Sequence, residues 1–395
     1  MKKFISIVLA LVLVFSACAI SASAYDLVPL KFDKNGEFKI MHLCDCQDEY
    51  PAIETMLKFI DAALKEYQPD IVILGGDNTT GPKETKEQAI EELCNVFVEN
   101  ETYFTLVFGN HDREQEVEND ELLPMYQKFG KGYCLAVDEV PSLHGTGTHN
   151  LSVMSSDLSK IKFNLWMFDS GSHYIDENGN DLGYDCVRED QIEWYKAKSK
   201  ALETLTGDKV PSLAFQHIVV GEVFEALFHE SAVDLGALTP KANGKIYSFF
   251  PKTENIQEGF LFEFPCPSEQ NFGQFQAMVD QGDVLAIFSG HDHINTYTTE
   301  LDGIKIINTP GATYNSYGNE ITRGMRMITV KESDPWNFET EVVTVSQFAI
   351  DNSDFAEDAE IDTITAKIML VLGDILLALN DFTKLFSTAI SAIVG

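Results

Sequence analysis

The chain has 395 residues, of which 45% are hydrophobic and 11% are aromatic. This length and composition allow a large buried core, so they exclude a chain that is disordered throughout. The formal net charge is −34 at pH 7, and no basic stripe is present, which makes nucleic-acid duplexes and anionic membranes poor partners by charge. Positive charge for an anionic substrate would have to come from bound metal ions.

The N-terminus has the pattern of an export signal. Two lysines precede the apolar run of residues 4–15, and small residues follow at positions 22–24. This pattern predicts a signal peptide over residues 1–24 and a secreted or extracytoplasmic mature protein. The second hypothesis is a lipoprotein that carries its lipid on Cys18.

Six cysteines remain after residue 24. An even number outside the cell permits disulfides, but six in a chain of this length are too few to form the scaffold. The hydrophobic core must therefore stabilise the fold.

The first part of the domain alternates between strands and helices. Short apolar runs predict strands at Phe38–Leu43, Ile71–Leu74 and Tyr103–Phe108, and helical spacing predicts helices at Ile53–Leu64 and Glu84–Val98. Buried strands separated by helices are typical of βαβ units, so we expect an α/β layered core.

The second part contains one further helix, at Asp190–Leu205, and several short apolar runs. These runs predict strands at Phe163–Phe168, Leu213–Gln216, Val284–Phe288, Lys305–Ile307 and Met325–Val330. Residues 227–270 show no clear period. We interpret them as an inserted loop region over one face, with substrate recognition as a hypothesis.

The composition changes after Val345. An acidic linker is expected over residues 346–363, followed by an amphipathic helical segment over residues 364–395. Charged residues interrupt the apolar residues of this segment, so it is not a simple membrane span. We expect helices that pack on the domain or on a partner; the alternative is a peripheral contact with the cell envelope.

Residues of metal-ligand type follow the predicted strands. Asp45, Asp77 and Asn110 follow the first three strands and lie roughly 30 residues apart, the length of one βα unit. Ligands in open α/β sheets bind beyond the carboxyl ends of strands, so these side chains should share one pocket, together with His217 after a later strand.

Two more histidines, His291 and His293, lie two residues apart, and an extended backbone would point them to the same side. Imidazole, carboxylate and amide oxygen together suit Zn²⁺, Mn²⁺ or iron better than Mg²⁺ or Ca²⁺. The pattern therefore favours a transition-metal site.

The ordered motifs resemble those of the calcineurin-like phosphoesterases, and the purple acid phosphatase-like branch is the most similar. The motifs are Gly76-Asp77-Asn78, Gly109-Asn110-His111-Asp112, Gln216-His217 and Gly290-His291-Asp292-His293. The similarity covers roughly residues 38–330. It implies a catalytic domain over residues 25–345 with a four-layer αββα fold, in which two mixed sheets form a β-sandwich flanked by helices.

The resemblance also implies a centre of two divalent ions, Mn, Fe or Zn, with Asp77 bridging them. The implied ligands of one ion are Asn110, His217 and His291, and those of the other are Asp45, Gln47 and His293. The family's first motif is Asp-x-His, whereas this chain has Asp45-Cys46-Gln47. An amide oxygen is a weaker donor than imidazole, so the Gln47 position should bind its metal less tightly or favour Mn²⁺ or Fe²⁺ over Zn²⁺.

By the same resemblance, the substrate is a phosphate-ester small molecule or a phosphorylated substrate. A hydroxide activated by both metals would attack the phosphate in line. His111 would act as the acid and stabilise developing charge, with Asp77 or Asp112 orienting its ring. A phosphomonoesterase is the leading hypothesis, with a phosphodiesterase as its near rival. The alternative of another class is a catalytically weak binding module with a degraded metal site at Gln47.

Overall fold

The computed structural model describes residues 30–234, 239–348 and 350. The expected signal peptide and the C-terminal segment 364–395 lie outside these residues, as does most of the expected linker. Within the described ranges, no helix combines the length and the apolar character needed to cross a membrane.

The first sheet has the strand order β16-β15-β1-β2-β3. Its strands are β1 (Glu37–Leu43), β2 (Ile71–Gly75), β3 (Phe104–Val107), β15 (Gly324–Lys331) and β16 (Asp334–Thr344). The first three run parallel, and β15 and β16 are antiparallel to their neighbours. Helices α2 (Glu54–Tyr67) and α3 (Lys83–Glu99) connect the parallel strands, which confirms the predicted βαβ units.

The second sheet has the order β13-β14-β12-β8-β5-β4. Its strands are β4 (His149–Met154), β5 (Ile161–Met167), β8 (Ser212–Phe215), β12 (Val284–Ser289), β13 (Thr298–Leu301) and β14 (Ile304–Asn308). Its central strands are parallel, whereas β4 and β13 at the two edges are antiparallel to their neighbours.

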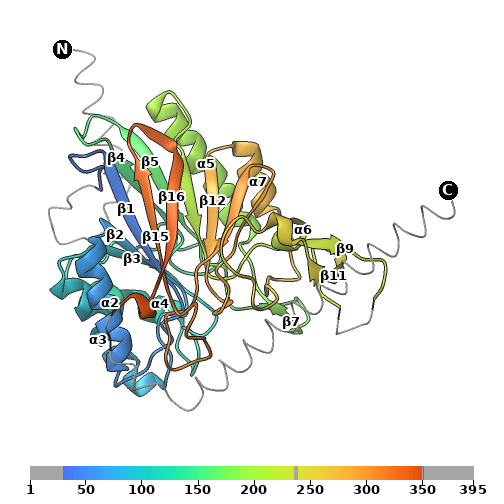
Figure 1. Cartoon of the computed structure of the whole chain (residues 1–395), viewed down its shortest axis with the longest axis horizontal. Coiled ribbons are helices and arrows are strands. Elements are labelled where there is room, and N and C mark those ends of the chain that lie inside the picture. Colours follow the sequence, from blue (N-terminus) through green and yellow to red (C-terminus); the bar gives the residue numbers. More distant parts are fainter. Residues whose placement is uncertain (1–29, 235–238, 349, 351–395) are drawn as a thin grey trace.

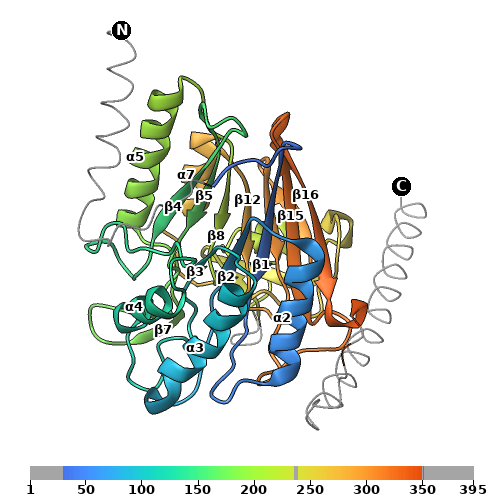
Figure 2. The same ribbon diagram turned by 90° about the vertical axis from the view of Figure 1, so that its left-hand side faces the viewer.

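The two sheets pack face to face, with helices on both outer faces (Figure 1). Strand β1 illustrates the alternation: Phe38 and Ile40 point into the core between the sheets, and Met41 and Leu43 pack toward the helices. Helices α2, α3 and α4 (Asn119–Phe129) cover the first sheet. Helices α5 (Glu189–Thr206) and α7 (Gln274–Gln281) cover the second (Figure 2). The four-layer α/β sandwich is confirmed.

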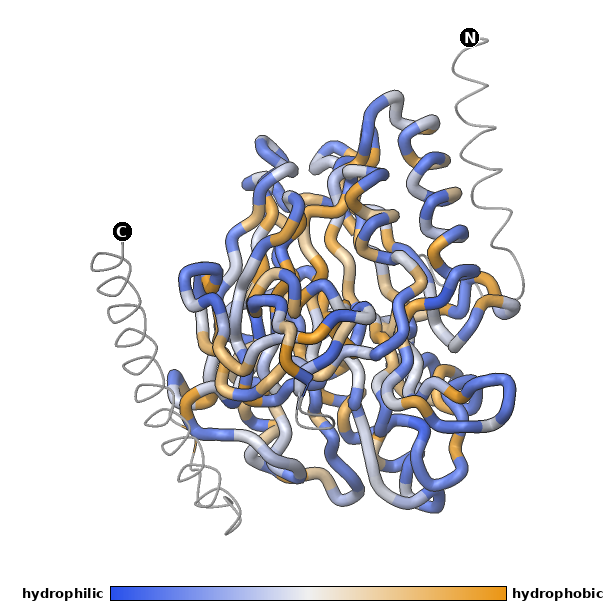
Figure 3. Tube along the Cα trace, turned by 90° about the vertical axis from the view of Figure 1, so that its right-hand side faces the viewer, coloured by the Kyte–Doolittle hydropathy of each residue, from blue (hydrophilic) through white to orange (hydrophobic). Residues whose placement is uncertain are grey.

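Apolar residues concentrate in the strands, and hydrophilic residues mark the outer loops (Figure 3). The inserted region is more regular than expected, because it contains a small antiparallel sheet. Its elements are α6 (Val223–Leu227), β9 (Phe228–Glu230), β10 (Lys241–Ala242), β11 (Lys245–Pro251) and the 3₁₀ turn η2 (Thr253–Asn255). A hairpin of β6 (His173–Ile175) and β7 (Asp181–Tyr184) and the 3₁₀ turn η3 (Val345–Gln347) complete the described fold.

Candidate metal centre

The loops that follow the parallel strands of both sheets meet at one edge of the sandwich. Asp45 follows β1, Asp77 follows β2 and Asn110 follows β3, while His217 and His291 follow β8 and β12 of the second sheet. All five side chains are buried or nearly so. Residues far apart in the sequence therefore form one centre, because the carboxyl ends of parallel strands lie together.

Two groups of possible ligand atoms share Asp77. The ligand atoms of Asp77, His217 and His291 lie within 4.8 Å of one another, and so do those of Asp45, Asp77 and His293. The resemblance implies the same grouping: His217 and His291 on one side, Asp45 and His293 on the other, and Asp77 shared by both. Such groups suit a cation, although carboxylates and imidazoles also gather for other reasons.

The backbone at the centre is unusual. Asp45, Gln47, Asp77 and His291 all have positive φ angles, of 50°, 41°, 50° and 71°. Strained residues of this kind persist where the surrounding structure holds them, often at functional sites. The expectation that an extended backbone aligns His291 with His293 is therefore wrong, because the turn at His291 sends the two rings to different ligand groups.

Two glycines make this crowding possible. Gly76 has a φ of 92°, and a Cβ placed on it would lie 2.5 Å from Nδ1 of His217. A Cβ on Gly109 would overlap the Asp77 carboxylate. The Gly-Asp and Gly-Asn motifs thus have a steric reason, since only glycine lets these neighbouring side chains approach.

Hydrogen bonds fix the tautomers of two histidines. Nδ1 of His217 lies 3.0 Å from the carbonyl oxygen of Gly75, and Nδ1 of His293 lies 2.8 Å from that of Tyr317. A carbonyl only accepts hydrogen bonds, so each Nδ1 donates. In the neutral ring, Nε2 then keeps a free lone pair, which is the usual arrangement in metal-binding histidines.

Two buried oxygen atoms at the centre have no hydrogen-bond partner among the described residues, Oε1 of Gln47 and Oδ1 of Asn110. Nε2 of His217 faces a carboxylate, 3.1 Å from Oδ2 of Asp77. A buried polar atom without a partner is costly, and a pair of bound cations would satisfy both oxygens. The donor set therefore fits divalent metal ions.

Gln47 fits this set despite the departure from histidine. Its Nε2 donates to Oδ2 of Asp77 at 3.1 Å. Because a carboxylate oxygen can only accept, the NH₂ group must face Asp77, and Oε1 is left without a partner. The side chain thus has an oxygen to offer and also holds the shared carboxylate.

The charges of the centre favour a cation. Burial acts to lower the pKa of His217, but the charges of Asp77 and Asp45 outweigh it and raise this pKa to about 10. Burial lowers the pKa of His293 to about 4 and raises that of Asp45 well above its usual value. The carboxylates of Asp77 and Asp45 thus favour positive charge in the centre, which a bound cation would supply in place of the His217 proton, and burial holds His293 neutral, as a ligand must be.

His111 lies at the entrance to the centre. Its side chain is 42% exposed, and its backbone N–H donates to Oδ1 of Asp77 at 2.7 Å. Its Nδ1 lies 2.6 Å from Oε1 of Glu114, so Glu114 orients the ring. The predicted roles of Asp77 and Asp112 in orienting this ring are therefore corrected.

Asp112 instead holds the loops together. Its carboxylate accepts hydrogen bonds from the backbone N–H groups of Asn78, Thr79 and Gly109, at 3.0, 3.2 and 2.8 Å. The side chain is fully buried and turned away from the ligand groups. Its contacts support a positioning role for the loops after β2 and β3 rather than a catalytic one.

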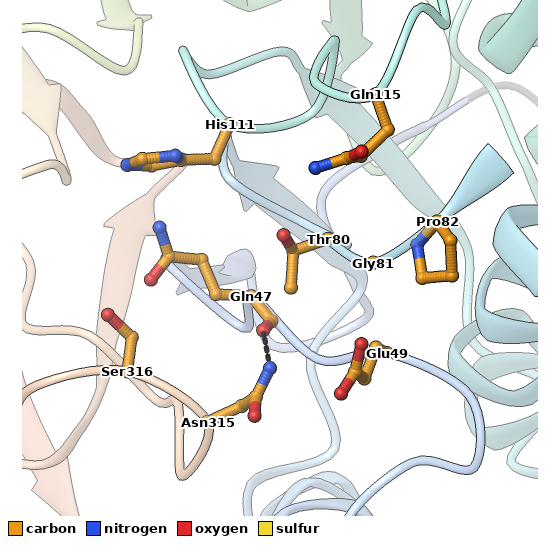
Figure 4. Close-up of a pocket in the computed structure, with 9 residues that line it drawn as sticks. All are labelled: Gln47, Glu49, Thr80, Gly81, Pro82, His111, Gln115, Asn315 and Ser316. Atoms are coloured by element: carbon orange, nitrogen blue, oxygen red, sulfur yellow. Dashed lines mark hydrogen bonds between the residues drawn. The ribbon is translucent and has the colours of Figure 1, made fainter.

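A pocket of about 440 Å³ adjoins the centre (Figure 4). Gln47 and His111 form the wall nearest the ligand groups, with Ser316 beside Gln47. The remaining lining residues are Glu49, Thr80, Gly81, Pro82, Gln115 and Asn315. None of the described residues of the inserted region 227–270 lines this pocket, so the hypothesis of substrate recognition by this region finds no support here.

Sequence patterns missed the residues that support His293. The ring of Tyr317 stacks on His293 with centroids 4.0 Å apart and an angle of 4°. The hydroxyl of Tyr317 in turn donates to the carboxylate of Glu263, which comes from the inserted region. No sequence signal indicated either of these two supporting residues.

All six cysteines of the described part are free. The five histidines outside the centre and its entrance are core or surface residues. His42 and His149 are buried, and His144, His173 and His229 are partly or largely exposed.

Comparison with known proteins found relatives in sequence and in structure. A probable inactive purple acid phosphatase (number 14) of Arabidopsis thaliana is 28% identical over 80% of each chain. A second one (number 29) is 25% identical over 73% of this chain and 75% of its own. A dimetal phosphatase from Danio rerio has a TM-score of 0.47 at 12% identity and covers 78% of this chain and 99% of its own. Residues 38–295 match the calcineurin-like phosphoesterase family, and the chain belongs to this family of phosphoric ester hydrolases.

Proposed function

We propose that this chain is a secreted phosphomonoesterase that works with two divalent ions held around Asp77. One observation carries the proposal: Oε1 of Gln47 and Oδ1 of Asn110 are buried without hydrogen-bond partners among the described residues, in the loops that also carry the two ligand groups sharing Asp77. Ligand-type atoms left in this state are expected where a cation binds.

Each ion has its own ligands besides Asp77. Asn110, His217 and His291 would hold one ion, and Asp45, Gln47 and His293 the other. When bound, a metal pair activates water and neutralises charge on the phosphoryl group. The mixture of imidazole, carboxylate and amide oxygen suits Mn, Fe or Zn.

His111 supplies the proton in this proposal. It faces the pocket, and Glu114 holds its Nδ1, so Nε2 is directed to the leaving group. A protonated imidazole can pass its Nε2 proton to the departing alkoxide, which lowers the barrier to breaking the P–O bond. The Glu114 carboxylate stabilises the positively charged ring while the proton is held.

The test is hydrolysis of p-nitrophenyl phosphate and of bis-p-nitrophenyl phosphate by the purified full chain, with Mn²⁺, Fe²⁺ or Zn²⁺ added. We expect turnover of the monoester that depends on metal and falls about 10²-fold or more in His111→Ala. Preference for the bis-ester would instead identify a phosphodiesterase. A folded protein that binds two metal ions without hydrolysing either ester would contradict the proposal.

A second candidate function is a binding module with little or no catalysis. Gln47 at a histidine position favours it, and the two Arabidopsis thaliana relatives are named as probably inactive. The His111–Glu114 pair argues for catalysis, because an oriented proton donor beside a metal centre has no evident use in simple binding. The same assay decides between the two.

Export is part of the proposal and rests on the N-terminal sequence alone. N-terminal sequencing of the mature protein should begin at residue 25. A lipid on Cys18 would support the lipoprotein hypothesis, and a retained residue 1 would contradict both. For the segment 364–395 we propose packing on the domain or a peripheral envelope contact, and vesicle flotation with and without this segment separates the two.

A further inference from the structure

The pocket beside the centre has two chemically different ends. Gln47 and His111 face the metal centre, where the proposed ions would supply positive charge. Glu49 lies at the other end, with its carboxylate near Gly81 and Pro82 (Figure 4). A ligand that fills the pocket from the centre outward would therefore pass from a cationic region to an anionic one.

The local fold holds Glu49 in this place. Asp48 accepts the backbone N–H groups of Glu49 and Ile53 at 3.0 and 2.6 Å, which fixes the turn. Gly81 has a φ of 85°, and a Cβ on it would lie 2.7 Å from Cβ of Glu49 and 3.0 Å from its Oε2. The absence of a side chain at Gly81 thus gives the Glu49 carboxylate its space against the pocket wall.

Glu49 is also available to a ligand. Its carboxylate makes no hydrogen bond or ion pair with another residue of the described ranges, and it is half-buried. Most other acidic residues around this site are engaged, as Glu114 is by His111 and Glu118 is by Arg113. An unpaired carboxylate in a pocket wall attracts a cationic group.

Nothing in the pocket recognises a second anion. None of its nine lining residues is Lys or Arg. The nearby Lys83 pairs with Glu121 at 3.1 Å, and the buried Lys86 donates to the Thr79 carbonyl oxygen at 2.9 Å. Substrates whose leaving group carries further phosphates need Arg or Lys at this position, so the pocket disfavours them.

We infer that the substrate is a small phosphomonoester whose alcohol part carries an ammonium group, and that Glu49 selects it. This inference rests on the proposed phosphomonoesterase function. Gln47 and Glu49 are two residues apart, so their Cα atoms are separated by at most about 7 Å, which suits a phosphate and an amine joined by a short alkyl chain. The hydroxyls of Thr80 and Ser316 offer further acceptors to an ammonium group, which has three N–H donors.

The test uses three probes of similar size and different charge: 2-aminoethyl phosphate, ethyl phosphate and phosphoglycolate. Binding to the metal-loaded full chain is measured by calorimetry, and kcat/KM by phosphate release. We expect 2-aminoethyl phosphate to be preferred over ethyl phosphate by about fivefold or more, and phosphoglycolate to be the poorest. Glu49→Gln should abolish the preference, and Glu49→Lys should shift it to phosphoglycolate.

Glu66→Gln is the matched control, because it removes the same charge from an exposed position on α2 and should keep the preference. A preference is a ratio, so partial misfolding of a variant does not change it. Equal binding of the three probes, or a preference that survives Glu49→Gln, would overturn the inference. Absence of p-nitrophenyl phosphate turnover would overturn the proposed function instead, and the binding series would still decide the role of Glu49.

Discussion

The buried histidines of this protein fall into two groups that burial alone does not distinguish. His42 and His149 lie within strands, and both ring nitrogens of each have protein partners. His217 and His293 follow strands, and in each only Nδ1 is held by a backbone carbonyl. The difference lies in Nε2, which has a partner in the strand histidines and faces carboxylates in the centre.

The surroundings give His217 electrostatics opposite to those of the strand histidines, whereas His293 resembles them because burial lowers its pKa to about 4. Burial lowers the pKa of His42 to about 3 and that of His149 to about 4. At His217 burial acts in the same direction, but Asp77 and Asp45 raise the pKa to about 10. A buried histidine is thus a structural group when its polar atoms are satisfied, and a candidate ligand when one nitrogen is kept for a cation.

The largest effect is expected from removing a histidine of the metal centre. His217→Ala should lose one metal ion and lower kcat/KM for p-nitrophenyl phosphate by about 10³-fold, because the metal supplies several kcal/mol of charge stabilisation. Metal content by plasma mass spectrometry and steady-state kinetics measure both. Full metal content in this variant would contradict the assignment of His217.

Removing a strand histidine should instead lower the stability of the fold. His149 bridges the two sheets, since its Nε2 lies 2.7 Å from the hydroxyl of Thr105 in β3 and its Nδ1 donates to the Gly147 carbonyl. His149→Ala should lower the free energy of unfolding by about 2–3 kcal/mol, through a cavity and unsatisfied partners. Urea unfolding measures this, and the exposed His173→Ala is the control, with a change expected below about 0.5 kcal/mol.

His149 should also make the stability depend on pH. An unfolded histidine takes up a proton below about pH 6.5, whereas folded His149 does so only below about pH 4. Between these values the unfolded state binds more protons, so this contribution to stability is present above pH 6.5 and is lost as the pH falls toward 4. The slope approaches about 1.4 kcal/mol per pH unit and should be absent in His149→Ala. Equal pH slopes in both proteins would refute this account.

The regular elements and the ligand positions that follow them could be predicted well from the sequence. Apolar runs predicted the buried strands, and the positions of Asp45, Asp77 and Asn110 after them placed these residues in one centre, because parallel topology brings strand ends together. Less regular elements escaped detection. Helix α4 contains Pro124, and β16 is mostly exposed, so neither shows a clean hydrophobic period.

The contacts that support His293 could not be predicted from the sequence, for a different reason. Tyr317 reaches His293 from one distant loop and Glu263 reaches Tyr317 from another, and no local pattern reports such contacts. The error at Asp112 is local: it is adjacent to His111, but the turn directs its carboxylate to backbone N–H groups while Glu114 reaches the ring. Adjacency in sequence is a poor guide where the backbone turns sharply.

Gln47 permits a direct test of the weaker metal position. Gln47→His should tighten Zn²⁺ binding there about tenfold, because imidazole is a better donor to Zn²⁺ than an amide oxygen. Competition with a chelator measures the affinity of each ion. Gln115→His is the matched control, since Gln115 lines the same pocket without belonging to the ligand set, and it should leave both affinities unchanged. An unaltered affinity in Gln47→His would show that residue 47 is not a ligand position.

The smallest effect is expected at Glu114, which acts through His111. Both side chains are partly exposed, so their ion pair contributes little, and Glu114→Gln should lower kcat about threefold with KM unchanged. Glu118→Gln, which removes the partner of Arg113, should leave kcat unaltered. The decisive measurement is the double variant: if Glu114 works only by orienting His111, adding Glu114→Gln to His111→Ala should cause no further loss. A further threefold loss would mean that Glu114 affects turnover independently of the His111 ring.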